Sequence, residues 1–235
     1  MGALVRRALA VAALGACSLA QAGVLDFEQA VGPALQYAGN AYQLGKYMIQ
    51  PDGFDAQPGD LVGALIKGTD DDFCANGLSC PANNASTYYA GLNDGGFFLW
   101  MADGSLLSLK SFNASFIGNG QVDALGGFVG ALGLDAAINV VDTFLAYVPG
   151  PAAGQFEFAP YATQAFGDEL FSYIYVYAYA CNAVTGICVT DSGLANFAID
   201  DIVTTDPVAL PEPASLAMVG AGLLGLVAAL RRRAT

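Results

Sequence analysis

The chain has 235 residues, with 21 acidic residues against eight basic ones, no histidine and a formal net charge of −13. Nucleic acids are excluded as partners, because binding them requires a basic surface that neutralises phosphates. The absence of histidine excludes Ser-His-Asp and Cys-His catalytic arrangements and histidine-based metal sites.

The first 22 residues have the three parts of a secretory signal peptide. Two arginines form a basic start, the apolar stretch ALAVAALGACSLA follows, and Ala20 and Ala22 complete an A-x-A cleavage site. The mature chain is therefore expected to begin at Gly23. The alternative is a lipoprotein signal, in which the stretch LGAC would place a lipid on Cys17.

Residues 23–208 are expected to form one all-β domain. Short apolar runs with a period of two are separated there by turns rich in Gly, Pro, Asn and Asp. The expected strands are 24–27, 42–50, 61–67, 97–101, 106–116, 128–140, 144–148, 155–158, 172–180 and 195–203. The apolar spacing of 135–148 would also suit a helix. This pattern predicts a β-sandwich of the jelly-roll type.

The strand predicted most clearly is SYIYVYAYA, residues 172–180. Its alternation places four tyrosines on one face, namely Tyr173, Tyr175, Tyr177 and Tyr179. Tyrosine has an apolar ring and a polar tip, so this face is a candidate for stacking on sugar rings. The alternative is that the tyrosines pack against a second layer of the domain.

Four cysteines follow the signal peptide and form two local pairs, Cys74 with Cys80 and Cys181 with Cys188. An even number of cysteines in an exported chain favours disulfides. Three pairings are possible, and the local one needs no long-range topology. A metal site is disfavoured, because the chain has neither C-x2-C spacing nor histidine.

The domain is strongly acidic once its two ends are set aside. Within residues 23–210 only three lysines remain against 20 acidic residues, a formal net charge of −17. If the first and last strands are neighbours, Glu28 meets Asp200 or Asp201, and these oxygens are a candidate site for a structural calcium ion. Clusters at Asp70–Asp72 and around Asp52 offer similar ligands. The alternative is a solvated acidic surface, and no other cofactor is expected.

The sequence predicts that the protein is not an enzyme. No G-x-S-x-G motif occurs. A pair of carboxylates, as in glycoside hydrolysis, is the chemistry left open. With 20 acidic residues in the domain some pair is inevitable, so this feature indicates nothing specific.

The last segment, 209–235, has three parts in a fixed order. They are Pro211-Glu212-Pro213, the uncharged run 214–230, and Arg231, Arg232 and Arg233. A run of this length lies at the short end of membrane-spanning helices, roughly 17 to 25 residues. The arginines predict a cytoplasmic end for a single transmembrane helix, with the domain outside.

This segment resembles the PEP-CTERM sorting signal of Gram-negative bacteria. The resemblance implies processing near Pro-Glu-Pro by an exosortase, an intramembrane thiol enzyme, in a host that makes exopolysaccharide. VLDFE and FAIDDI are also similar to the first and last strands of PEP-CTERM ectodomains, which implies a jelly-roll-like sandwich. STYYAGLNDGG and SLLSLKSFNASFIG resemble one group of that family that carries no assigned activity.

We therefore expect an exported protein that is anchored transiently in the inner membrane and then reaches the cell surface or the extracellular matrix. Its expected role is structural or adhesive and linked to exopolysaccharide or other matrix components. The alternative is a carbohydrate-binding module, with or without calcium.

Overall fold

The computed structural model describes residues 22–30, 34–69, 73–74, 78–118, 125–182, 188–189 and 195–205, which belong to one compact unit, Ala22–Asp206. The predicted signal peptide before Ala22, the sorting segment and Asp70–Asp72 lie outside the described residues. Within the part that is described, no helix is long and apolar enough to cross a membrane.

The described residues form fourteen strands and one short 3-10 helix. The strands are β1 Ala22–Leu25, β2 Leu35–Tyr37, β3 Tyr42–Leu44, β4 Tyr47–Gly53, β5 Leu61–Lys67, β6 Thr87–Gly91, β7 Gly95–Met101, β8 Ser108–Phe116, β9 Leu125–Leu134, β10 Val140–Val148, β11 Ala159–Ala162, β12 Tyr173–Asn182, β13 Cys188–Val189 and β14 Phe197–Thr205. The 3-10 helix η1 is Gln164–Asp168. The predicted all-β class is confirmed for this unit.

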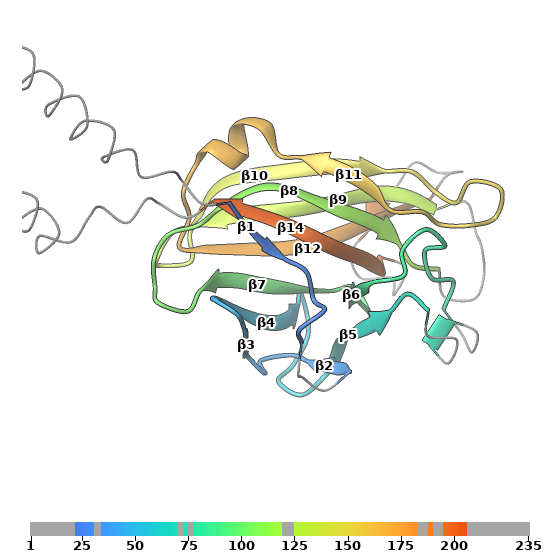
Figure 1. Cartoon of the computed structure of the whole chain (residues 1–235), viewed down its shortest axis with the longest axis horizontal. Helices are drawn as coiled ribbons and strands as arrows, with labels where there is room; N and C mark the ends of the chain where they lie inside the picture. Colours follow the sequence, from blue (N-terminus) through green and yellow to red (C-terminus); the bar gives the residue numbers. More distant parts are fainter. Residues whose placement is uncertain are drawn as a thin grey trace, which may run out of the picture. The chain divides into compact units, whose positions relative to one another are not determined.

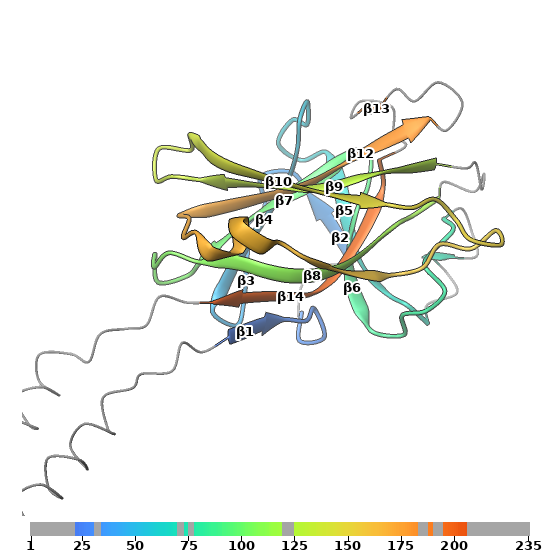
Figure 2. The same ribbon diagram turned by 90° about the horizontal axis from the view of Figure 1, so that it is seen from above.

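The strands build two antiparallel sheets that pack face to face (Figures 1 and 2). Sheet A has the order β11–β8–β14–β6–β5–β2, with β1 also on β14, and sheet B has the order β10–β9–β12–β7–β4–β3, with β13 on β12. From β6 to β14 the chain changes sheet at each connection except β9–β10 and β12–β13. This alternation is typical of a jelly roll.

The main core lies between the sheets and is built from the inward half of each strand. Its largest fully buried members include Phe27, Phe97, Phe112, Phe116, Phe171 and Phe197. On β12 the inward residues are Ile174, Val176 and Ala178, so the period of two read from the sequence decides which side chains enter the core. A buried hydrogen bond of 2.7 Å between the hydroxyls of Tyr47 and Thr204 joins the two layers.

Several strand boundaries differ from the prediction. The run 42–50 is interrupted at Gly45, where a positive φ of 59° makes a turn between β3 and β4. Residues 155–158 do not form a strand, which begins instead at Ala159 as β11. The strands β2 and β6 were missed, because each is short and its apolar pattern is broken by polar or glycine residues.

Residues 135–148 form a turn and a strand, and the helical alternative is wrong. The Asp135 carboxylate accepts hydrogen bonds from the backbone N–H groups of Ala137 and Asn139 at 2.8 and 2.9 Å. Ile138 between them has a positive φ of 63°. These local bonds close a turn and stop any helix, so β10 runs back along β9.

Both predicted local disulfides are present, and they differ in setting. Cys181 and Cys188 are cross-strand partners in β12 and β13. Cys74 and Cys80 are joined in the long connection between β5 and β6. This connection packs on the outer face of sheet A, which makes it part of the domain's second hydrophobic cluster.

The outer face of sheet A is covered by the chain's own loops. Tyr88, Ile66 and Ala198 are buried there beneath partly buried residues of two loops, namely Phe73, Cys74, Leu78, Cys80 and Phe158. The Asn83 amide accepts from the Phe158 N–H at 2.7 Å and donates to its carbonyl oxygen at 3.0 Å. These bonds hold the two loops to each other over the sheet.

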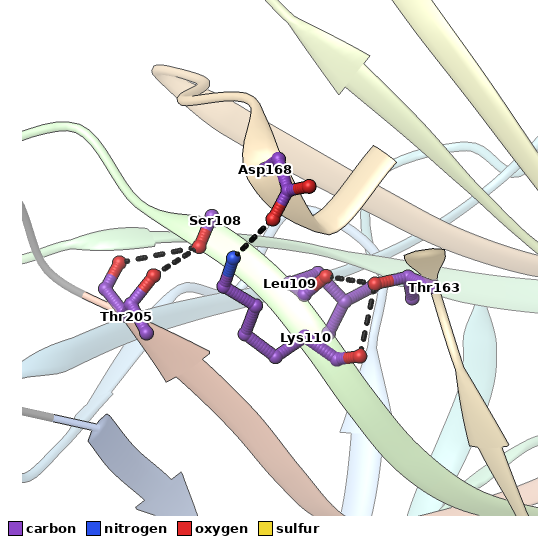
Figure 3. Close-up of polar contacts among 6 residues, drawn as sticks. All are labelled: Ser108, Leu109, Lys110, Thr163, Asp168 and Thr205. Atoms are coloured by element: carbon purple, nitrogen blue, oxygen red, sulfur yellow. Dashed lines mark hydrogen bonds and ion pairs between the residues drawn. The ribbon is translucent and has the colours of Figure 1, made fainter. Parts of the chain in front are cut away.

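The end of β14 that leads to the sorting segment is tied to β8 (Figure 3). The hydroxyls of Ser108 and Thr205 are hydrogen-bonded. Beside them the Lys110 ammonium contacts the Asp168 carboxylate at 2.9 Å, and the Thr163 hydroxyl donates to the Lys110 carbonyl oxygen at 3.0 Å. The chain therefore leaves the domain from a strand held within the sheet.

Candidate functional site: the aromatic face of sheet B

The outer face of sheet B carries a layer of aromatic side chains, which we call the aromatic face. It is formed by Tyr173, Tyr175, Tyr177 and Tyr179 of β12, Phe98 and Trp100 of β7, Phe128 and Leu132 of β9, and Leu145 and Tyr147 of β10. All are outward residues in strands whose alternate residues are buried in the core. Strand periodicity alone therefore places them together.

The rings contact one another across the strands. Tyr175 and Tyr177 are stacked, with ring centroids 5.9 Å apart, and Tyr177 meets Tyr179 edge-on at 5.1 Å. Phe98 lies 4.7 Å from Tyr175, and Trp100 lies 5.7 Å from Tyr173. Such pairs contribute about 0.5–1.5 kcal/mol each beyond the area that they bury.

Two of the four predicted tyrosines are buried although they lie on an outer face. Tyr175 and Tyr177 are only 6% and 3% exposed. Their rings lie over glycines of neighbouring strands, because a Cβ atom at Gly130 would be 2.7 Å from Cζ of Tyr177 and one at Gly96 would be 3.1 Å from Oη of Tyr175. Sequence reasoning missed both glycines, whose signal is a glycine within an apolar strand.

Burial moves the titration of two of these tyrosines further above physiological pH. Burial is the main cause that raises the pKa of Tyr175 well above its usual value, followed by the negative charge of Asp52. Burial likewise raises the pKa of Tyr177. Tyrosine is already neutral at physiological pH and these shifts keep both phenols so, which means that they offer hydroxyl groups rather than charges.

Phe54 packs on the two buried tyrosines as an exposed ring. Its side chain is 55% exposed and follows directly after β4. The ring meets Tyr175 edge-on at 6.0 Å and Tyr177 at 5.8 Å. Tyr175 and Tyr177 thus support an exposed aromatic residue that the sequence did not single out.

Two open hollows flank Phe54. The larger, of about 430 Å³, is lined by Gly53, Phe54, Asp55, Ala56, Asp60, Leu61, Val62, Asn93 and Asp94. The smaller, of about 260 Å³, is lined by Asp52, Gly53, Phe54, Phe98, Leu132, Leu134, Ile138, Val140 and Tyr175. One hollow is rich in carboxylates and the other is mainly apolar, so the two sides of Phe54 offer different chemistry.

This arrangement suits a ligand with apolar faces and many hydroxyl groups. Phe54 offers a ring for stacking, and Asp55, Asp60 and Asp94 offer acceptors for hydroxyl donors. Part of this acceptor capacity is used within the protein, because Asp60 accepts from the Gln57 N–H at 2.8 Å and Asp94 from the Ala195 N–H at 2.9 Å. A carboxylate accepts several hydrogen bonds, so further acceptor positions remain.

The residues proposed for calcium lie elsewhere, on sheet A. Asp200 is buried, and its carboxylate accepts from Ser86 Oγ at 2.6 Å and from Asn84 Nδ2 at 3.0 Å. Glu28 accepts from the Thr87 N–H at 2.5 Å. Among the residues that the structure describes, no three acidic or cysteine side chains gather closely enough to hold a metal ion.

Two asparagines hold the carboxylates of Asp200 and Asp201 by hydrogen bonds. Asn84 donates to Asp200, and Asn113 donates from Nδ2 to the exposed Asp201 at 2.8 Å. Asp201 has a positive φ of 49°, at the irregularity where β14 changes register against β8. The one sequence signal was the repeated Asn-Ala-Ser pattern at these two positions.

The domain is thus an all-β sandwich with an open aromatic face, and its sequence carries a recognised sorting motif. A family model described as the PEP-CTERM protein-sorting motif matches residues 209–233. This match confirms the resemblance noted from the sequence: the chain carries a PEP-CTERM sorting motif in its C-terminal region. The motif implies export, processing by an exosortase and sorting to the cell surface.

One of the solved structures that are similar to this chain supports the fold. A DUF4465 family protein from Bacteroides caccae is similar with a TM-score of 0.50 and 14% identity, over 80% of this chain and 100% of that one. A DUF4465 family protein from Bacteroides ovatus has a TM-score of 0.46 and 8% identity, and the match again covers 80% of this chain and 100% of that one. The CBM22-1-CBM22-2 tandem domain of Paenibacillus barcinonensis Xyn10C has a TM-score of 0.35 and 13% identity, and the match covers 81% of this chain and 50% of that one. No curated protein matches the chain in sequence.

Proposed function

We propose that this exported protein is a non-enzymatic adhesive component of the cell surface or extracellular matrix, and that it holds matrix polysaccharide through the aromatic face of sheet B. The observation that carries the proposal is the exposed Phe54 ring, set on buried tyrosines between an acidic hollow and an apolar one.

Three features support this assignment. The chain covers the outer face of sheet A with its own loops, while Phe54, Leu145 and Tyr147 on the side of sheet B stay exposed. Exposed apolar groups that gather in this way mark interaction sites. The charge of the domain disfavours nucleic acids and anionic lipids, whereas a neutral, hydroxyl-rich polymer suits both the ring and the carboxylates.

The test is a binding assay with exopolysaccharide isolated from the host. We expect Phe54→Ala to weaken binding by about tenfold or more, since an exposed aromatic anchor typically carries at least 1.4 kcal/mol. The matched control is Leu170→Ala, which removes a side chain of similar exposure beside η1. Unchanged binding by Phe54→Ala, or equal losses in both variants, would contradict the proposal.

A second candidate is a module that recognises one defined glycan and depends on a structural calcium ion. It is favoured by the buried Asp200 of β14, whose carboxylate is hydrogen-bonded to Asn84 and Ser86 just before β6. A glycan array with and without a calcium chelator separates the two. Binding of one glycan that is lost on chelation favours the module, whereas calcium-independent binding to bulk matrix favours the adhesive role.

Removal of the gene tests the role in the cell. We expect a weaker matrix and lower surface adhesion, because the sorting motif directs the domain to the outside. An unchanged matrix together with unchanged adhesion counts directly against the adhesive role. Turnover of the host polysaccharide by purified protein would instead indicate a hydrolase.

We further propose that the mature protein runs from Gly23 to near Pro211, after signal peptidase and exosortase have acted. Before processing, the run 214–230 holds it in the inner membrane as one helix. Mass spectrometry of the surface form tests both ends. A retained RRRAT sequence would contradict C-terminal processing, and a lipid on Cys17 would replace the signal-peptide assignment.

A further inference from the structure

The described strands at the four ends of the two sheets are protected very unequally, and β1 and β13, which pair off these paths, have only four and two residues. The edge strands β2 and β3 have three residues each, and β11 has four residues including Pro160. The fourth, β10, has nine residues, VVDTFLAYV, with no proline, lysine or arginine. Short length, proline, lysine and bulges are the usual protection against edge-to-edge pairing. The strand β10 has one register irregularity, between Val140 and Asp142, and its remaining residues form the longest regular edge among the described strands at the ends of the two sheets.

The backbone of β10 directs a regular set of groups away from the sheet. The Thr143 N–H is bonded to the Asp142 carboxylate at 2.8 Å, so it does not point toward β9. Because alternate residues of an antiparallel strand bond to the same side, the N–H and C=O groups of Leu145 and Tyr147 also face outward. The free edge therefore offers the pattern that an antiparallel partner strand needs.

The exposed side chains on this edge are mostly apolar. Leu145 and Tyr147 are 49% and 59% exposed, and both lie on the outer surface of sheet B. The strand carries one charged residue, Asp142. A partner strand therefore meets an apolar surface with a single acidic group near one end.

We propose that β10 pairs antiparallel with β10 of a second copy of this protein, around a two-fold axis at Leu145. In this register Leu145 faces Leu145, and Thr143 faces Tyr147, so residues whose backbone groups point outward oppose each other. Asp142 lies opposite Val148, which keeps the two acidic groups apart. The strand is thus complementary to itself, as a symmetric dimer interface requires.

The pairing has a consequence for the outer surface. Residues directly opposite in an antiparallel pair lie on the same face of the sheet. The two aromatic faces would therefore lie side by side on one extended sheet, with two Phe54 sites directed to the same side. Two linked sites bind a polymer more tightly than one, without any new contact. The dimer itself does not depend on the proposed ligand.

Site-specific cross-linking of the full chain, with Cys17→Ser in every variant, tests the register. Leu145→Cys places one thiol on the proposed axis, and the four domain cysteines are already paired. We expect a disulfide-linked species of twice the monomer mass on non-reducing gels. The control Ile138→Cys places a thiol in the adjacent turn, at a position where Ile138 is 61% exposed. This variant is expected to run at the monomer mass on the same gels. Equal cross-linking in both variants, or none in either, overturns the proposal.

A second measurement removes the pairing without a thiol. Leu145→Lys places two like charges opposite each other, and we expect the dimer dissociation constant in sedimentation to rise by about tenfold or more. An unchanged melting temperature shows that the variant is folded. Thr143→Lys, at a second exposed position, faces Tyr147 of the other copy rather than a second lysine, so it should raise the dissociation constant less. Wild-type protein that is monomeric at all concentrations, or a cross-link of Leu145→Cys to a chain of different mass, contradicts self-pairing.

Discussion

The outer faces of the two sheets both carry apolar side chains, but they differ in how far loops of the chain cover them. On sheet A, Tyr88 and its neighbours are buried beneath two loops, one of which holds the Cys74–Cys80 disulfide. On sheet B, Tyr175 and Tyr177 lie flat over glycines and support the exposed ring of Phe54. One face has become a second core, and the other leaves the ring of Phe54 exposed.

The difference has an energetic meaning. Burying apolar surface stabilises a fold by about 25 cal/mol per Å², so covering sheet A contributes to stability. Exposed side chains such as Phe54 and Tyr147 contribute little to folding, and their burial energy becomes available only when a partner binds. Substitutions on sheet A should therefore change stability, and those on sheet B should change binding.

The largest expected effect is on sheet A. Tyr88→Ala removes a fully buried ring that packs 5.4 Å from Phe158, and we expect the free energy of unfolding to fall by about 3–5 kcal/mol. Tyr88→Phe is the control. The Tyr88 hydroxyl is buried without a hydrogen-bond partner in the described structure, so its removal should cost nothing or stabilise the fold. Equal losses for both variants in chemical denaturation would contradict this account of the covered face.

A smaller loss is expected from the disulfide in the covering loop. Cys74→Ser with Cys80→Ser should lower the free energy of unfolding by about 2 kcal/mol, the chain-entropy value for a short loop. It should also increase binding of a hydrophobic dye, because the loop covers an apolar face. The matched pair Cys181→Ser with Cys188→Ser should lower stability similarly without the rise in dye binding. An increase in dye binding by both double variants would show that the dye reports a general loosening of the fold rather than exposure of the covered face.

The third prediction concerns the polar contacts between sheet A and its cover. Burial is the main cause that raises the pKa of Asp200 above its usual value of 3.8. The folded state therefore holds this proton more tightly than the unfolded chain. The stability that this group contributes is fully present below pH 3.8 and is lost as the pH rises through the raised pKa.

Asp200→Asn tests this dependence, because asparagine does not titrate. The stability of the wild type relative to the variant should decline as the pH rises above 3.8, as measured by thermal unfolding at a series of pH values. Asp201→Asn is the control, since Asp201 is exposed. A constant difference between wild type and Asp200→Asn across this range would mean that Asp200 is ionised equally in both states.

The smallest effect on stability is expected at the open face. Phe54→Ala should change the free energy of unfolding by less than about 1 kcal/mol, because the ring is already half exposed. The same variant is expected to lose most of its polysaccharide binding. A loss of stability as large as that of Tyr88→Ala would show that Phe54 is a structural cover, like the loops on sheet A.

Much of the local structure was predictable because its causes are local. The alternation in 172–180 requires a strand with tyrosines on one face, and cysteines seven or fewer residues apart can pair without any knowledge of topology. Boundaries were less predictable. The turn before β10 depends on hydrogen bonds of one side chain, Asp135, which apolar periodicity does not record.

The sequence by itself determined the all-β class, the two disulfides and the sorting motif, since each follows from a pattern within a short stretch. Only the tertiary structure decided which tyrosines are buried, which sheet face is covered and which edge strand is left open. It also brought Asn84 and Asn113 to Asp200 and Asp201. These outcomes depend on contacts between residues tens to more than a hundred positions apart, and the period of a strand fixes its two faces without saying what will lie against either of them.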